Sequence, residues 1–329
     1  MKRTILIFAI TASLIACKRP AAQPPVETSP WIAVEVSGLP DGIEVYRNSE
    51  DLCDKKAVAY YAEADLSKVS FDIWSINDPY ANGTNDGLKT PSEVYDDTHA
   101  AVIINGGYFY VDGGKRYNAS LAVSDGVLLG TNLNYASQDW VSIYYPTRAA
   151  FIVHTDGSME VCWTYYNSSE NKHYMYSNPA KNGWTLGPKK APNATYPEEA
   201  RIFEAQTAIG GGPVLLKDGE IRNTWKYELF YGSGSDDKMP EESHPRTAVG
   251  VKSDGKMVFF VAEGRGMTEG VAGFTTGEVA RILLDLGCTD AINLDGGGSS
   301  CMLLGGEETI KVSDGHQRSV ASTLMFFAK

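Results

Sequence analysis

A short apolar strand that runs into an acidic residue and three glycines constrains this chain more than any other stretch. Residues 290–301 read Asp-Ala-Ile-Asn-Leu-Asp-Gly-Gly-Gly-Ser-Ser-Cys. Three consecutive glycines cost backbone entropy and pack no side chains, so they indicate a backbone with positive φ or one that another group approaches closely. A plain turn between two strands gives the same pattern. In the functional interpretation, Asp295 ends a strand and faces a ligand.

The residues before this stretch predict one strand–helix–strand crossover. Apolar residues fill 257–262 and 291–294, which we expect to be buried strands. Between them, Thr275 and Glu278 fit a helix-capping box, apolar residues follow at helical spacing, and Gly287 has the usual terminating position. Such crossovers are normally right-handed and join parallel strands. Both strands would therefore end at the same edge of a sheet.

Two carboxylates follow the strands of this crossover. Glu263 comes after the first strand and Asp295 after the second. If the strands are parallel neighbours or nearly so, both side chains face one cleft beyond the strand ends. Paired carboxylates suit glycosyl transfer, in which one acts at the anomeric carbon and the other manages a proton. Glu263 could equally begin a solvated loop.

A second strand ends in the same way. Residues 101–104 are a buried-strand run after a short helix that starts near Thr90 and Pro91, and Asn105, two glycines, Tyr108 and Phe109 follow. The two aromatic rings are compatible with packing and with stacking on a sugar. We therefore expect a second point at which a strand delivers a polar side chain and flexible backbone to a site.

Hairpins account for much of the remaining chain. Asp-Gly pairs, which favour tight hairpin turns, occur at 125–126, 156–157, 218–219 and 254–255. The stretches that begin at Arg148 and Arg246 are similar to each other and both finish in such a pair. The predicted fold class is α+β: a strand-rich mixed sheet built from hairpins, with a few helices and one late strand–helix–strand crossover.

Composition and charge restrict the function. The 329 residues are 43% hydrophobic, which is enough for one large domain or two small ones, and the net charge is −12. Nucleic acid needs a basic surface, so we expect no nucleic-acid partner. A few local arginines can still bind a phosphorylated ligand.

The first thirty residues are predicted to be an export signal and a tether. The apolar run 5–15 follows two basic residues and is too short to span a bilayer. Leu-Ile-Ala-Cys at 14–17 resembles a bacterial lipobox, although an ordinary signal peptide with a chance cysteine is the alternative. We expect a lipoprotein signal peptide at 1–17, a proline-rich tether at 18–30 and an exported protein anchored to the cell-envelope membrane through Cys17.

The sequence predicts neither a cofactor nor a metal site. No CxxC spacing indicates zinc. Disulfides are compatible with an exported protein, but the sequence cannot rank the pairings of Cys53, Cys162, Cys288 and Cys301.

Several of these motifs resemble the phosphodiester glycosidase family. The resemblance is carried by residues 244–250, 291–299 and 105–109, with further similarity at 210–216 and 318–323. It extends over about residues 60–329. We therefore expect a phosphodiester glycosidase-like domain at 31–329, in which 31–75 could form a strand subdomain.

The resemblance implies that Asn105, Arg246, Thr247, Asp295, Gly296, Gly297 and Ser299 line the site. Together with the other residues that the strand ends and glycine turns point to, they make up the candidate site. The candidate catalytic residues are Asp295 and Glu263. The candidate substrate-binding residues are Asn105, Gly106, Gly107, Tyr108, His244, Arg246, Thr247, Arg265, Gly296, Gly297, Ser299, Ser300 and Arg318. Animal members of the family have Asp-Gly where this chain has Glu263-Gly264, so we expect a different sugar or aglycone specificity.

The resemblance also implies a reaction. The leading hypothesis is hydrolysis of the anomeric C–O bond of a sugar-1-phosphodiester, such as a phosphorylated glycan, releasing sugar and a phosphomonoester. The alternatives are a phosphodiesterase that cleaves the P–O bond and a surface glycan-binding lipoprotein without turnover. In the leading hypothesis Arg246 holds the phosphate, because a guanidinium can form two parallel charge-assisted hydrogen bonds to it.

Overall fold

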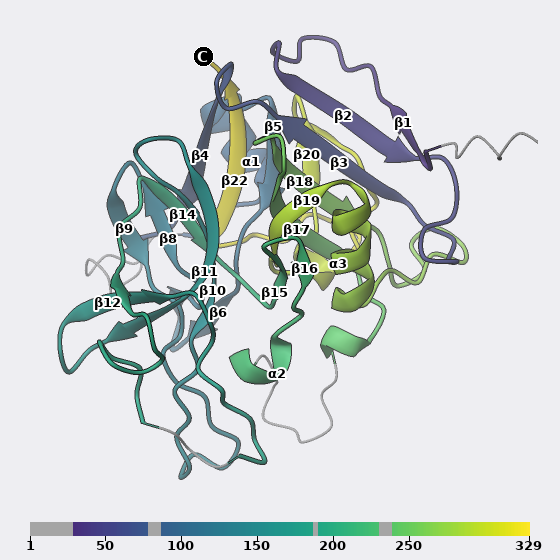
Figure 1. Ribbon diagram of the computed structural model, residues 1–329. Helices are drawn as coiled ribbons and strands as arrows, with labels where there is room; N and C mark the ends of the chain where they lie inside the picture. The colour runs from purple at the N-terminus through teal and green to yellow at the C-terminus, as the bar shows by residue number, and fades with distance from the viewer. Residues whose placement is uncertain (1–28, 78–86, 187–189, 230–238) are drawn as a thin grey trace, which may run out of the picture.

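The computed structural model describes residues 29–77, 87–186, 190–229 and 239–329. The predicted signal peptide and nearly all of the predicted tether lie outside these ranges. Within them, no helix combines the length and the apolar character needed to cross a bilayer. The described chain is rich in strands, which form four sheets, and has few helices (Figure 1).

The largest sheet has eight strands. In spatial order they are β1 (Trp31–Ala33), β2 (Ile43–Asn48), β3 (Ala59–Ala64), β18 (Met257–Ala262), β17 (Arg246–Lys252), β19 (Cys288–Asn293), β15 (Val214–Lys217) and β16 (Glu220–Ile221). The range 31–75 therefore does not form a sheet of its own, because β3 pairs with β18 along its whole length.

A second sheet has seven strands and is built from the middle of the chain. In spatial order they are β13 (Arg201–Ile202), β12 (Lys172–Tyr176), β11 (Met159–Asn167), β10 (Arg148–Val153), β14 (Thr207–Gly210), β8 (Ala122–Ser124) and β9 (Val127–Gly130). The predicted Asp-Gly hairpin turns are confirmed, since the four glycines have φ between 74° and 85° and each lies between two paired strands.

The third sheet has five strands and joins distant parts of the chain. In spatial order they are β21 (Glu307–Glu308), β20 (Met302–Leu304), β5 (Val102–Asn105), β22 (Ser322–Ala328) and β4 (Val69–Ser75). The hairpin of β6 (Phe109–Asp112) and β7 (Lys115–Asn118) forms the fourth sheet.

The helices begin as the sequence predicts. Thr90 caps α1 (Pro91–Thr98) and Thr275 caps α3 (Thr276–Asp285), and both ends have complete capping boxes. Gly287, just beyond α3, has a φ of 88°. The remaining helical segments are short: α2 (Trp225–Glu228) and the 3-10 turns η1 (Met239–Glu241) and η2 (Gly297–Ser299).

The sheet around α3 differs from the predicted mixed sheet. Every strand pairing in the described residues is antiparallel, and β17 lies between β18 and β19. The strands before and after α3 therefore run in the same direction without being neighbours. The sequence predicts the hairpin of β17 and β18 but not this insertion, because the pairing of β17 with β19 joins segments separated by the whole of β18 and α3.

The central strands of the eight-stranded sheet are buried on both faces. One face packs against the other two large sheets, and the rings of Phe259 and Phe326 stack with centroids 3.8 Å apart. On the other face lies α3 (Figure 1), and its Val279 and Leu283 belong to the same buried cluster as Phe260. Two-sided burial explains why β18 is apolar at every position.

Candidate functional site

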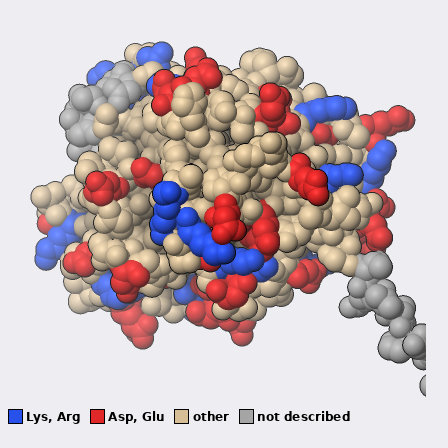
Figure 2. All heavy atoms as spheres, turned by 90° about the horizontal axis from the view of Figure 1, so that it is seen from above, with Lys and Arg blue, Asp and Glu red and all other residues tan. Residues whose placement is uncertain are grey.

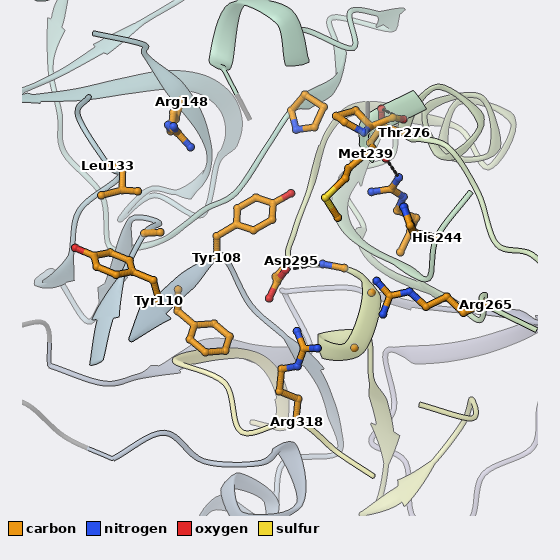
Figure 3. A pocket seen from close by; sticks show the side chains of 18 residues that line it. Tyr108, Tyr110, Leu133, Arg148, Met239, His244, Arg265, Thr276, Asp295 and Arg318 are labelled. Atoms are coloured by element: carbon orange, nitrogen blue, oxygen red, sulfur yellow. Dashed lines mark hydrogen bonds between the residues drawn. The ribbon is translucent and has the colours of Figure 1, made fainter. Parts of the chain in front are cut away.

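A cavity of about 450 Å³ lies where strands of all three large sheets begin or end. Its walls come from segments far apart in the sequence, and Figure 3 shows side chains converging on it from several elements. The lining residues are Tyr108, Phe109, Tyr110, Ala119, Leu133, Arg148, Pro213, Met239, Pro240, His244, Arg246, Arg265, Thr276, Asp295, Gly296, Gly297, Gly298 and Arg318.

Asp295 is the carboxylate of this cavity. It follows β19, and its side chain points into the open space between Tyr108, Arg265 and Arg318 (Figure 3). Its Oδ1 accepts a hydrogen bond from the Gly296 N–H at 2.9 Å. Burial raises the pKa of Asp295 to about 6, against the opposing effects of Ser299, Arg318, Gly296 and Arg265. The group is therefore an acid or base close to neutral pH.

A buried network holds the backbone of Asp295. The Nδ2 of Asn105 donates to the Asp295 carbonyl at 2.8 Å, and the Asp295 N–H donates to the Gly106 carbonyl at 3.1 Å. The Oδ1 of Asn105 accepts from the Thr247 hydroxyl at 2.7 Å and from the Cys301 N–H at 3.1 Å. The ends of β5, β17 and β19 are thus fixed to one another.

Two arginines of the cavity start strands and are almost fully buried. Arg246, at the start of β17, is 6% exposed, and Arg148, at the start of β10, is 8% exposed. Arg246 donates through Nε to the Phe274 carbonyl at 2.8 Å and through Nη2 to the carbonyls of Met239 and Glu242 at 2.6 and 2.9 Å. Burial lowers the pKa of Arg148 to about 10.

The other two arginines belong to loops and are more accessible. Arg318 donates to Asp314 at 2.7 Å and to the Ser299 hydroxyl at 3.3 Å. Arg265 has a φ of 58° and donates to the Ser313 hydroxyl at 3.3 Å. Both guanidinium groups lie beside Asp295 in Figure 3.

The cavity has a charge unlike that of the whole chain. Among the described residues, four arginines and one carboxylate line it, although the chain carries a net charge of −12. On the face shown in Figure 2, by contrast, acidic and basic side chains are interspersed. The arrangement therefore favours an anionic ligand inside the cavity.

Two further polar side chains complete the wall. The Tyr108 hydroxyl donates to the Gly212 carbonyl at 2.9 Å and accepts from Asn293 at 3.1 Å, and burial raises its pKa. His244 Nε2 lies 3.3 Å from a carboxylate oxygen of Glu242, and burial, followed by Arg246, lowers its pKa. His244 is therefore neutral at pH 7.

The family model for phosphodiester glycosidases matches residues 98–327. This chain belongs to that family. The match covers β5 to β22, including every described wall of the cavity, and confirms the resemblance of the motifs.

A Bacillus subtilis relative has no described activity. The SPbeta prophage-derived uncharacterized protein YomE is 40% identical over 208 residues, which are 62% of this chain. The chain spans about a quarter of the length of that relative, 24%.

Solved structures share the fold at lower identity. The catalytic domain of zebrafish N-acetylglucosamine-1-phosphodiester alpha-N-acetylglucosaminidase, auto-inhibited by its pro-peptide, matches with a TM-score of 0.57 and 19% identity, over 92% of this chain and 85% of that chain. A hypothetical protein from Synechocystis matches with a TM-score of 0.57 and 17% identity, over 92% and 64%. These similarities show the fold of the family in this chain.

Several residues of the family motifs support the cavity from behind. Asn105, Thr247, Ser299 and Ser300 are at most 2% exposed. The Ser300 hydroxyl has no hydrogen-bond partner among the described residues, whereas Ser299 bonds both Asp295 and Arg318. Gly106 and Gly107 pack against Ser322 and Ser120, too closely for any side chain.

Glu263 is the predicted site residue that the geometry separates from the others. It is 3% exposed and is absent from the described lining of the cavity. Its Oε1 accepts from the Lys311 N–H at 2.8 Å. The two carboxylates follow strands that run in the same direction, with β17 between them. The geometry gives no support to a pair of carboxylates acting together in the cavity.

Sequence reasoning did not single out several lining residues. Arg148 is the most important of them, and its signal was the similarity between the hairpins that begin at Arg148 and Arg246. Met239, Pro240 and Thr276 have no motif and reach the wall through the packing of η1 and α3.

No group of three or more His, Cys, Asp or Glu side chains in the described ranges could hold a metal ion. Cys53, Cys162, Cys288 and Cys301 are free, so none of the pairings that the sequence left open is formed.

Proposed function

We propose that this protein hydrolyses the anomeric C–O bond of a sugar-1-phosphodiester and releases the sugar and a phosphomonoester. The observation that carries the proposal is the position of Asp295, which is the one carboxylate in the described lining of a cavity that also contains four arginines. Burial raises the pKa of Asp295 to about 6. Membership of the phosphodiester glycosidase family supports the same reaction class.

The leaving group explains how one carboxylate can suffice. A phosphomonoester has a second pKa of about 6, so as a leaving group it departs at neutral pH with little need of protonation. Ordinary glycosidases need a second carboxylic acid to protonate the departing oxygen. Here the guanidinium groups of Arg265 and Arg318 would stabilise the charge that grows on the phosphate.

Asp295 would act at the anomeric carbon. Ionised at pH 7, it can take a proton from the attacking water or attack the carbon itself. Its carbonyl and N–H are bonded to Asn105 and Gly106, so the carboxylate has a fixed position. Such preorganisation is the main contribution of a scaffold to catalysis of this kind.

Hydrolysis in oxygen-18 water tests the reaction. A panel of sugar-1-phosphodiesters, including capsule and teichoic-acid fragments, would be treated with the protein and with its Asp295→Asn variant. Label in the released sugar is expected, since the C–O bond breaks. Label in the phosphate would establish the P–O-cleaving alternative, and binding without release would establish a glycan-binding protein.

The proposed location follows from the N-terminal sequence. We propose that Cys17 carries a lipid that holds the protein at the cell envelope, where phosphorylated glycans occur. Cys17→Ser is expected to release the protein from membrane fractions. Unchanged partitioning of the variant would contradict the anchor and leave the proposed reaction untouched.

A further inference from the structure

One loop reaches both accessible arginines of the cavity. In the segment 311–318, hereafter the arginine loop, Ser313 accepts a hydrogen bond from Arg265, and Asp314 pairs with Arg318. The loop turns at Gly315, whose φ is 76°. Its start is fixed from β18, because the Lys311 N–H donates to the buried Glu263 carboxylate at 2.8 Å.

Asp314 determines which edge of the Arg318 guanidinium remains for a ligand. Both Nε and Nη2 donate to the same oxygen, Asp314 Oδ2, at 3.0 and 2.7 Å. Nη1 lies 3.3 Å from the Ser299 hydroxyl, which itself bonds Asp295. The pair therefore fixes the side chain with one edge occupied and the other beside the catalytic carboxylate.

The arginine side chains pack directly against the glycines that follow Asp295. A Cβ atom at Gly297 would lie 2.7 Å from Arg265 Nη2. A Cβ atom at Gly298 would lie 2.1 Å from Arg318 Nη2 and 2.3 Å from Asp314 Oδ2. Even an alanine at position 298 would displace the Asp314–Arg318 pair. The third glycine is therefore required for this pair to lie where it does.

We propose that Asp314 and Glu263 are positioning residues, which hold the arginine loop so that Arg318 and Arg265 face the phosphate of the substrate. The inference rests on the proposed function, since it assumes an anionic group beside Asp295. In this proposal Glu263 acts from outside the described lining, by holding the start of the arginine loop through the Lys311 N–H.

Charge and position make opposite predictions for Asp314→Asn. If Asp314 only reduces the positive potential of the cavity, loss of its charge should tighten the binding of an anion. If it positions Arg318, the same change should weaken binding, because the guanidinium loses its fixed orientation. Inorganic phosphate at pH 7.5, measured by isothermal titration calorimetry, is a sufficient probe and requires no turnover.

We expect Asp314→Asn to weaken phosphate binding about tenfold, the equivalent of one charge-assisted hydrogen bond. The effect should disappear in an Arg318→Ala background, since the two residues act as one unit. Gly298→Ala keeps every charge and should weaken binding similarly. Glu160→Gln is the matched control, because Glu160 also pairs with an arginine at 2.7 Å, on β11 and away from the described lining.

Glu263 is tested by a pair of substitutions. Glu263→Gln retains an oxygen that can accept from Lys311 and should keep phosphate binding within about twofold, whereas Glu263→Ala should weaken it severalfold. Melting temperatures identify any variant that fails to fold.

Each outcome decides something. Tighter or unchanged phosphate binding in folded Asp314→Asn would overturn the positioning role while the proposed reaction stands. A wild-type protein that binds no phosphate would remove both the anion site of the proposed function and this inference.

Discussion

The four arginines in the described lining of the cavity are of two kinds, which differ in position and in exposure. Arg148 and Arg246 start strands and are nearly buried, whereas Arg265 and Arg318 lie on loops and are reachable by a ligand. Arg246 donates three hydrogen bonds to backbone carbonyls, whereas Arg318 pairs with the Asp314 carboxylate and donates to the Ser299 hydroxyl. Arg246 thus holds a wall of the cavity, whereas under the proposed function the loop arginines Arg265 and Arg318 contact the substrate.

Both kinds of arginine surround Asp295, and substitution of Asp295 should have the largest effect on activity. Asp295→Asn is expected to reduce turnover at least about a hundredfold, because the group at the anomeric carbon loses its charge. Steady-state kinetics on the substrate found in the oxygen-18 screen measures this. Activity within tenfold of wild type would remove Asp295 from the mechanism.

The same variant should be more stable than the wild type at pH 7. The folded-state pKa of about 6 exceeds the unfolded value near 3.9, so the folded protein binds more protons between these pH values and loses stability as pH rises through them. Asparagine removes that loss, which amounts to at most about 2–3 kcal/mol. Urea unfolding at pH 7.5 and pH 4 should show the gain only at pH 7.5.

Arg246→Ala tests whether a strand-borne arginine stabilises the fold. Three carbonyls, of Phe274, Met239 and Glu242, would lose their donor, so we expect a loss of about 3 kcal/mol or more in the free energy of unfolding. Arg318→Ala should change it by about 1 kcal/mol or less, since its ion pair is partly exposed. Equal losses would show that the two kinds do not differ in structural role.

Arg318→Ala also tests whether a loop arginine binds the substrate. We expect KM to rise about tenfold with a smaller change in kcat, because the variant loses one bidentate contact to the phosphate. Arg318→Lys should recover only part of this loss, since an ammonium cannot present two parallel donors. A Lys variant with wild-type KM would mean that charge alone is required.

The smallest expected effect concerns pH. We expect kcat/KM to fall as pH drops through about 6, where Asp295 is protonated. Arg318 lowers this pKa and Arg148 is not among its main influences, so Arg318→Ala should move the acid limb upward, whereas Arg148→Lys should not. Coincident shifts in the two variants would contradict the assignment.

Local chemistry was predictable where the causal residues are close in sequence. The capping boxes at Thr90 and Thr275 and the four Asp-Gly turns each depend on a few neighbouring residues, and all are present. Asp295 could be singled out because strand, carboxylate and glycines are contiguous. What these residues do together could not be predicted in the same way.

The remaining features depend on long-range pairing. Asn105 was expected to bind substrate, but β5 lies between β20 and β22 and turns its side chain toward the backbone of Asp295. Glu263 was expected beside Asp295, but it accepts a hydrogen bond from the Lys311 N–H and is not part of the described lining. Arg148 begins a hairpin similar to the one that begins at Arg246, but its place in the wall depends on how two sheets pack.

The pairing of early and late strands also has a kinetic consequence. β3 pairs with β18, and β4 pairs with β22, so both sheets join segments from opposite parts of the chain. Contacts of such high sequence separation slow folding, because distant segments must meet before they are stabilised. Until β22 is available, β4 and β5 lack the strand that lies between them and expose unpaired edges that invite aggregation. We expect the nascent chain to depend on chaperones until its last strand has been synthesised.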